Sequence, residues 1–134
     1  MLERQRTLFP KGGDIFMSEI SKDHKILVIM ILNKTELLDE LLLEFTSAGI
    51  DSATVLNSVG MAQQLSTLEN TRILSTLRPF ITSDHSENKM IFTIVDESQI
   101  ETIRTVVKDV IGDLSDPDTG VLFAIPTLFT EGFH

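Results

Sequence analysis

Apolar positions along the chain form two copies of one pattern, in which a short β-rich run is followed by an amphipathic helix and a second β-rich run. The segments of the two copies are, in order, residues 25–32, 34–48 and 53–56, then residues 90–95, 97–111 and 120–126. Short runs of β-branched and apolar residues predict strands, and apolar residues at helical spacing predict amphipathic helices. The doubled pattern therefore predicts an α+β, ferredoxin-like βαββαβ fold, a four-stranded antiparallel sheet with two helices on one face.

The two predicted helices carry their own start, stop and burial signals. Their apolar stripes consist of Leu37, Leu38, Leu41, Leu42, Phe45 and Ala48 in the first helix and Ile100, Ile103, Val107 and Val110 in the second. The predicted capping pairs are Asn33 with Glu36 and, for the second helix, either Asp96 with Gln99 or Ser98 with Glu101. Gly49 and Gly112 follow the last apolar positions, where glycine can adopt the left-handed conformation that ends a helix.

The first and last predicted strands are apolar on both faces. Residues 26–32 read ILVIMIL and residues 121–125 read VLFAI, so neither strand alternates between apolar and polar positions. Two helices cover only one face of a sheet, and the other apolar face needs a different cover. We expect that cover to come from other copies of the chain, which predicts a homo-oligomer. Phe92 and Phe123, assigned to the two central strands, are expected to be core residues.

Residues 61–89 form a long insertion between the second and third predicted strands, where a short hairpin turn would suffice. A connection of this length in a compact domain is usually functional. Leucines recur in it at near-helical spacing until Pro79, which predicts a short helix with an apolar stripe. That stripe either contacts a partner protein or folds back on its own domain or a neighbouring subunit. The expected partner-contacting residues are Leu65, Leu68, Arg72, Leu74, Leu77 and Arg78.

Residues 1–24 precede the repeated pattern and are expected to form a flexible N-terminal extension, so that the predicted domain comprises residues 25–134. Within the extension, Lys11-Gly12-Gly13-Asp14 can be encoded by a strong bacterial ribosome-binding sequence, a short distance before Met17. Residues 1–16 are therefore interpreted either as a translated leader, with Met17 as the natural start, or as part of a genuine extension. The intact mass of protein made from the native locus distinguishes the two interpretations.

The composition excludes several classes of function. The 134-residue chain holds 11 basic and 20 acidic residues, a net charge of −9, which opposes binding to nucleic acid or anionic lipid because both require phosphate neutralisation. With no cysteine and no apolar run long enough to span a bilayer, we expect a cytoplasmic protein without direct membrane insertion. No nucleophile, phosphate-loop or dinucleotide motif occurs, so no catalytic residue is predicted. Asp113, Asp116 and Asp118 lack the spacing of a calcium loop, and no metal site is predicted.

Several of these segments resemble the PII signal-transduction proteins, the nitrogen regulatory family. The resemblance covers residues 25–127 and is carried by residues 25–33, residues 35–49, the strand leading into Ser58-Val59-Gly60, and Thr119-Gly120-Val121-Leu122-Phe123-Ala124-Ile125-Pro126. Its most specific piece is the last, a Gly-x-hydrophobic-Phe-x-hydrophobic-Pro motif. Because the order of the elements and the position of the insertion also agree, the chain is identified as a divergent, bacterial PII-like member.

The resemblance implies a non-enzymatic homotrimer whose three sheets line a central barrel. It also implies a small-molecule effector in the clefts between subunits. A partner protein, either a transporter or an enzyme, would be controlled through the loop at residues 61–89. The implied effector-binding residues are Gly60, Gln63 and Gln64 at the base of that loop, together with Asp118, Thr119 and Gly120 before the last strand.

The chain departs from the family at the positions where the family grips nucleotide phosphates. The family's Gly-Phe-Gly-Arg-Gln reads Gly60-Met61-Ala62-Gln63-Gln64 here, Val121 replaces a lysine, and no arginine follows Pro126. A hydrogen bond to a charged group contributes about 1.5–3 kcal/mol, so losing these cations lowers nucleotide affinity by several powers of ten. ATP or ADP is therefore disfavoured, the cofactor stays unknown, and the absence of tyrosine excludes tyrosine uridylylation. The only candidates for compensating cations are Arg72, Arg78 and Lys89 of the insertion, and the five acidic residues after Lys108 work against a triphosphate.

Two other functions stay open from the sequence. One is an interaction or scaffold module without effector binding, whose apolar stripe docks a transporter or an enzyme. The other is a metal-handling trimer that resembles the divalent-ion tolerance proteins of the same architecture. The lack of cysteine and of clustered histidine disfavours the metal-handling alternative.

Overall fold

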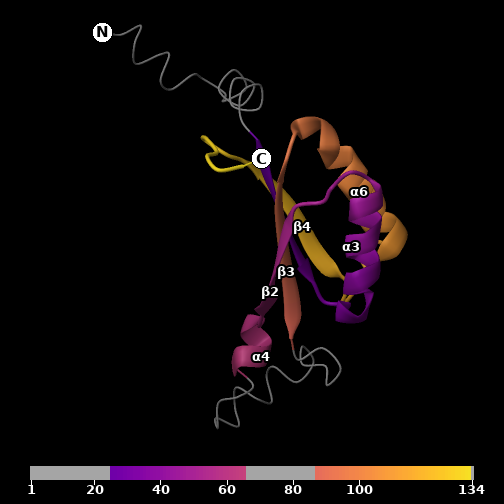
Figure 1. The fold of residues 1–134 in the computed structure, drawn as a ribbon. Coiled ribbons are helices and arrows are strands. Elements are labelled where there is room, and N and C mark those ends of the chain that lie inside the picture. Colours follow the sequence, from indigo (N-terminus) through magenta and orange to yellow (C-terminus); the bar gives the residue numbers. More distant parts are fainter. Residues whose placement is uncertain (1–24, 66–86, 134) are drawn as a thin grey trace, which may run out of the picture.

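The computed structural model describes residues 25–65 and 87–133, and its elements follow the predicted order (Figure 1). They are β1 (Ile26–Leu32), a 3-10 turn (Thr35–Leu37) that continues into α3 (Leu38–Ser47), β2 (Ala53–Ser58), α4 (Met61–Leu65), β3 (Asn88–Val95), a 3-10 turn (Glu97–Gln99) that continues into α6 (Ile100–Val110), and β4 (Gly120–Pro126). The predicted N-terminal extension, residues 1–24, lies outside the described residues.

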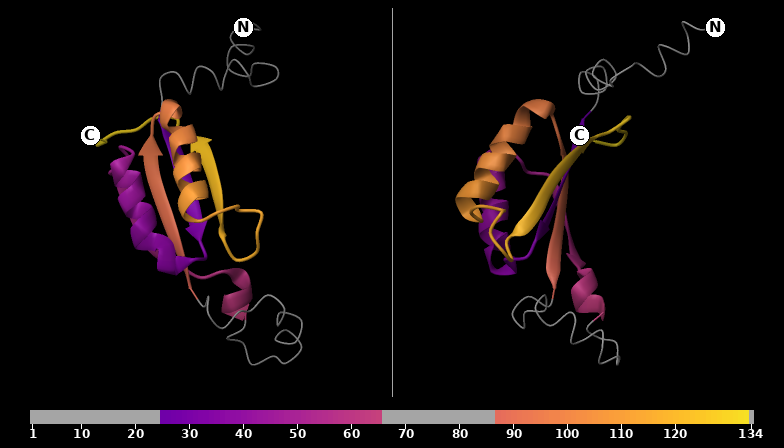
Figure 2. Two further views of the ribbon diagram at one scale, coloured as in Figure 1. Left: turned by 90° about the vertical axis from the view of Figure 1, so that its right-hand side faces the viewer. Right: turned by 180° about the vertical axis from the view of Figure 1, so that it is seen from behind.

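The four strands form one antiparallel sheet in the order β2-β3-β1-β4, with β2 and β4 as its edges. Helices α3 and α6 lie side by side on one face of this sheet, and no helix layer from the described residues covers the opposite face (Figures 1 and 2). This arrangement confirms the predicted fold class. The central strand β1 pairs with both β3 and β4, as expected when each copy of a doubled strand–helix–strand unit contributes one central and one edge strand.

The core lies between the sheet and the two helices. Every second residue of β1 is buried there, and these residues are Ile26, Val28, Met30 and Leu32. From the helix side, Leu41 and Phe45 of α3 and Ile103 and Val107 of α6 are buried against them, with the flanking apolar residues of both predicted stripes partly buried. The helix faces were thus predicted correctly except for Ala48, which is exposed because it lies past the last turn of α3.

The two helices begin differently. Asp96 and Gln99 form a reciprocal capping box, in which the Asp96 backbone N–H donates to Gln99 Oε1 at 2.9 Å. The predicted cap at Asn33 is wrong, since no side-chain hydrogen bond caps the turn at Thr35–Leu37. Asn33 instead donates its backbone N–H to Thr119 O at 3.0 Å, so it extends the pairing of β1 with β4 beyond the strand. Within residues 25–65 and 87–133, no helix has the length and apolar character to cross a membrane.

The insertion is shorter at its C-terminal end than the sequence predicted. Strand β3 begins at Asn88 rather than at residue 90, and Lys89 pairs with Asn57 of β2, to which its Nζ donates a hydrogen bond. Ladder pairing needs backbone groups rather than apolar side chains, and it therefore continues past the apolar run. Of the expected partner-contacting residues, Leu65 ends the short helix α4, and the others lie outside the described residues, namely Leu68, Arg72, Leu74, Leu77 and Arg78.

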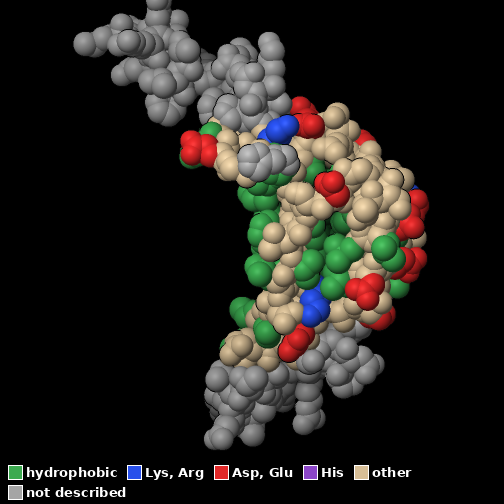
Figure 3. Space-filling view, in the orientation of Figure 1, with side chains coloured by type: hydrophobic (Ala, Val, Ile, Leu, Met, Phe, Trp, Pro, Cys, Tyr) green, Lys and Arg blue, Asp and Glu red, His purple; other side chains and the backbone are tan. Residues whose placement is uncertain are grey.

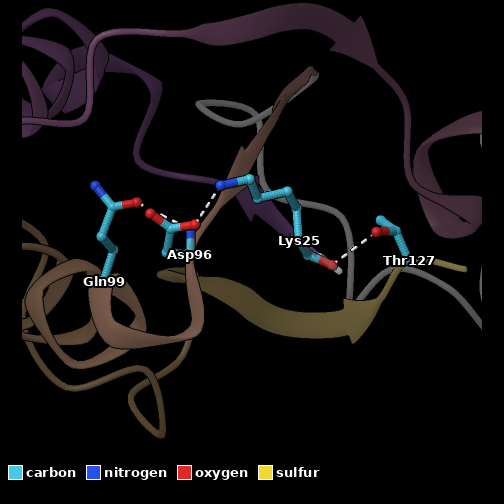
Figure 4. A network of polar contacts seen from close by, with 4 residues as sticks. All are labelled: Lys25, Asp96, Gln99 and Thr127. Carbon is cyan, nitrogen blue, oxygen red and sulfur yellow. Dashed lines mark hydrogen bonds and ion pairs between the residues drawn. The ribbon is translucent and has the colours of Figure 1, made fainter. Parts of the chain in front are cut away.

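Lys25 ties three segments together at the end of the sheet where β1 begins (Figure 4). Its ammonium group forms an ion pair with Asp96, at the junction of β3 and the turn before α6. Its carbonyl oxygen accepts hydrogen bonds from the backbone N–H and the hydroxyl of Thr127, at 3.0 and 2.7 Å. The end of β4 is therefore fixed to β1 although β4 is an edge strand.

Candidate functional site

The sheet face opposite the helices, here called the open face, is mostly apolar, and each of the four strands contributes apolar side chains to it. The pairing register places on it Leu27, Ile29 and Ile31 of β1, Leu56 of β2, Met90, Phe92 and Ile94 of β3, and Val121, Phe123 and Ile125 of β4. Leu56 and the three β4 residues are between 44% and 56% exposed. Figure 3 shows hydrophobic side chains gathered along this hollowed side of the molecule. Contiguous apolar surfaces of this kind mark interaction sites.

Phe92 lies on the central strand β3 as predicted, but the predicted central position of Phe123 and the prediction that both residues are core residues are wrong. Strand β4 is an edge strand, and the register places both phenylalanines on the open face. Both pair with Ile29 of β1, one from each side. Phe92 is only partly buried, and Phe123 is exposed. No charged residue occupies an open-face position in the described strands, so nothing on this surface resists burial by another apolar surface.

The predicted effector-binding residues fall into two groups at one end of the sheet but at opposite edges. Gly60, Gln63 and Gln64 follow β2, and Asp118, Thr119 and Gly120 precede or begin β4. Leu32 pairs with both Lys89 and Gly120, which places the end of β2 and the start of β4 at the same level. Three strand spacings separate the two edges, roughly 14 Å. One chain therefore does not bring the two groups together.

The group before β4 is held rigidly by its own loop. The hydroxyl of Thr119 is buried and donates to Asp116 O at 2.9 Å and Leu114 O at 3.3 Å. Asp118 is exposed and adopts a left-handed backbone conformation with φ of 58°, which aspartate tolerates better than most residues. The side chain of Thr119 thus shapes the loop, and contact of this group with an effector stays a prediction.

The two predicted site glycines differ in the space around them. A Cβ atom on Gly120 would lie 2.5 Å from the carbonyl oxygen of Ile31, so β4 approaches β1 at a distance that only glycine permits. A Cβ atom on Gly60 would meet only the Asn88 side-chain amide, at an ordinary 3.6 Å. Close packing therefore explains why a glycine occupies position 120, at the start of β4. Nothing in the structure explains why a glycine occupies position 60, after β2.

A cleft of about 350 Å³ lies between α6 and the start of β4, and its residues were not predicted as a site. It is lined by Arg104, Thr105 and Lys108 of α6, by Asp113 and Leu114 of the following loop, and by Leu122 of β4. Arg104 and Lys108 are the only basic residues after Lys89 in the sequence, one helical turn apart. The only signal for this cleft in the sequence was the four-residue spacing of these two basic residues, next to the apolar stripe of the second predicted helix. Among the described residues, no group of three or more His, Cys, Asp or Glu side chains is placed to hold a metal ion.

Asp113 stabilises the loop that forms one wall of this cleft. The backbone N–H of Ser115 donates to Asp113 Oδ1 at 2.9 Å, and the Ser115 hydroxyl donates to the same oxygen at 2.7 Å. Both hydrogen bonds lower the pKa of this carboxyl group, and the bond from the backbone N–H has the larger effect. A carboxyl group whose pKa is lower in the folded than in the unfolded state stabilises the fold. This contribution is fully present at pH values above the unfolded pKa, near 4, and is lost as the pH falls through the folded pKa.

Asp113→Asn is therefore expected to lower the free energy of unfolding at pH 7 and to leave it nearly unchanged at a pH below the folded pKa of Asp113. Urea unfolding of both proteins across the acid range measures the difference. Two stability curves that run parallel over the whole range would contradict the assigned role of Asp113.

Comparison with solved structures identifies the fold as that of the PII proteins. A functionally unknown protein from Pediococcus pentosaceus shares 15% identity and a TM-score of 0.55, covering 82% of this chain and 98% of that chain. Arabidopsis thaliana PII bound to citrate shares 13% identity and a TM-score of 0.53, covering 79% and 80%. The B. subtilis GlnK–ATP complex shares 17% identity and a TM-score of 0.50, covering 79% and 84%. The predicted resemblance is confirmed as a divergent PII-like fold.

Comparison of the sequence with family models and with curated proteins gives no match.

Proposed function

We propose that this chain is a PII-like regulatory protein that works without catalysis. In this proposal it forms a homotrimer, binds a small-molecule effector at the seams between subunits, and controls a partner protein through residues 61–89. The observation that carries the proposal is the separation of the two predicted effector-binding groups to opposite edges of one sheet, at the same end.

A closed ring of three sheets explains this separation. When identical subunits meet head to tail, the β2 edge of one sheet faces the β4 edge of the next. Gly60, Gln63 and Gln64 of one subunit then lie beside Asp118 and Gly120 of its neighbour at every seam. The same ring turns the three open faces inward, where their apolar side chains are removed from water.

The chemistry of the similar structures supports a small anionic effector. One of them is a PII protein bound to citrate, and another is a GlnK–ATP complex. This chain lacks the cations with which the family grips nucleotide phosphates, so a carboxylate-bearing metabolite, with its smaller charge, fits the seam better than a nucleoside triphosphate does.

The proposal predicts the size of the assembly. Light scattering on the purified protein is expected to give about three times the 15.0 kDa chain mass. A monomer at micromolar concentration would overturn the proposal, because no seam would exist for the effector.

Mixing two variants tests whether each site is shared between subunits. Gln64→Ala changes the β2 side of the seam, Asp118→Trp obstructs the β4 side with a bulky ring, and each variant alone is expected to lose binding at every seam. After unfolding and refolding together in equal amounts, about one seam in four combines two unaltered sides and regains binding. Calorimetry with citrate, 2-oxoglutarate and ATP measures the number of sites. Recovery of no sites in the mixture would place the site within one chain instead.

A further inference from the structure

We propose that the groove between α6 and β4 is a second ligand site, which binds a small organic anion that has an apolar body. This groove lies between α6 and β4, so the site goes beyond the proposed seam. None of the residues predicted for the effector lines it.

Two cations in the groove are available to a ligand. The partner of Arg104 is Glu101, one turn earlier on the same helix, and the two side chains are 65% and 78% exposed. Such surface pairs contribute at most about 1 kcal/mol, so Arg104 readily exchanges Glu101 for another anion. Lys108 makes no hydrogen bond or ion pair with any residue of the described chain. The nearby carboxylate of Asp113 is already held by Ser115.

The other basic side chains in the described ranges are already engaged. Lys25 forms an ion pair with Asp96, Lys34 donates to the carbonyl oxygen of Ile111, and Lys89 donates to Asn57. Arg104 and Lys108 are four residues apart on α6, which places them on the same side of the helix, roughly 6 Å apart along its axis. The pair can therefore contact one carboxylate or phosphate group together.

An apolar cavity of about 110 Å³ extends the cleft toward the start of α6. Ile100, Ile103 and Ala124 line it, and Arg104 and Leu122 line both hollows, so the cleft and the cavity adjoin along one groove between α6 and β4. A cavity with apolar walls and a few convergent polar groups is the usual form of a small-molecule site. The ligand that fits places its anionic group between Arg104 and Lys108 and its apolar body against Ile100.

The charges at the rim limit the charge of the ligand. Glu101 and Asp113 line the same cleft as the two cations, so the charged side chains of the cleft sum to zero. An anion with one or two charges gains from the cations, whereas a triphosphate also meets both carboxylates. The ligand class is therefore a carboxylate or a phosphate monoester on a ring-sized apolar body.

The test uses the full chain, isotope-labelled, with phenyl phosphate, phenylacetate, inorganic phosphate and ATP as probes. Titration followed by amide NMR is expected to shift the signals of Gly112, Leu114 and Leu122 with at least one of the two ring-bearing anions, at a Kd of a few millimolar or tighter. Inorganic phosphate is expected to bind at least about tenfold more weakly because it leaves the apolar cavity empty. The tighter of the two ring-bearing probes identifies the anion as phosphate or carboxylate.

Arg104→Gln and Lys108→Gln are each expected to weaken binding of that probe about tenfold or more. Lys25→Gln, which makes the same charge change at the other end of the sheet, is expected to leave the Kd unaltered. The proposal is overturned if neither ring-bearing anion shifts these signals at about 10 mM, or if both groove variants bind as the unaltered chain does. It is also overturned if ATP shifts the signals of Gly112, Leu114 and Leu122 at a lower concentration than phenyl phosphate does. These outcomes leave the seam proposal untouched, because its residues lie outside the groove.

Discussion

Phe123→Asp is expected to convert the oligomer into folded monomers. Phe123 lies on the open face opposite Ile29, and its side chain is 44% exposed in the single chain. An aspartate there is solvated in the monomer, so the fold of each chain is retained. In the assembly the same carboxylate would be buried without a partner, at a cost of about 3–5 kcal/mol in each subunit, with further repulsion between the copies around the axis. Light scattering measures the mass, and circular dichroism measures the retained fold.

Leu43→Asp is the matched control for this prediction. Leu43 is 68% exposed on α3, which lies on the helix side of the sheet, away from the open face. The same change in charge at Leu43 is expected to leave the oligomer intact. If Phe123→Asp keeps the mass of the unaltered protein, the open face is not the interface, and the proposed barrel is wrong.

Gly120→Ala is expected to destabilise the chain by about 2–3 kcal/mol, the upper part of the range for forcing an extra carbon into a closely packed position. The added Cβ would lie 2.5 Å from the carbonyl oxygen of Ile31, and a backbone atom cannot rotate away as a side chain can. Strand β4 must therefore shift away from β1 at its first residue. For a domain of this size, the midpoint of thermal unfolding is expected to fall by roughly 10 °C. Scanning calorimetry at a fixed protein concentration measures it.

Gly60→Ala provides the comparison within the other half of the predicted seam. Its added Cβ meets only the flexible amide of Asn88 at 3.6 Å, so the unfolding midpoint is expected to change little. Equal destabilisation by the two variants would contradict the close approach of β4 to β1. The contrast also guides binding experiments, because lost effector binding in a Gly120 variant would reflect a displaced strand as much as a lost contact.

The amphipathic helices and the strands were predictable from local pattern. The stripe through Leu41 and Phe45 and the one through Ile103 and Val107 each point to one buried helix face, and the structure buries these four residues. The cap at Asn33 failed because a local capping signal competes with the pairing of Asn33 to Thr119, a residue far along the chain. A contact between residues far apart in the sequence cannot be predicted from the residues around either one of them.

The candidate sites were only partly predictable for the same reason. The sequence could name Gly60 and Asp118, but their positions at opposite edges of the sheet follow from strand order. The groove of Arg104 and Lys108 was missed because its second wall, Leu122, comes from another element.

The sequence by itself determined the doubled strand–helix–strand unit, the two buried helix faces and an apolar surplus on the first and last strands, because each depends on the spacing of neighbouring residues. Only the tertiary structure decided that Phe123 lies on an exposed face of an edge strand, that Gly120 is a close-approach position, and that α6 and β4 enclose a groove. Each of these depends on which strands pair and in which register. A shift of one residue in that pairing would turn every side chain of the strand to the other face.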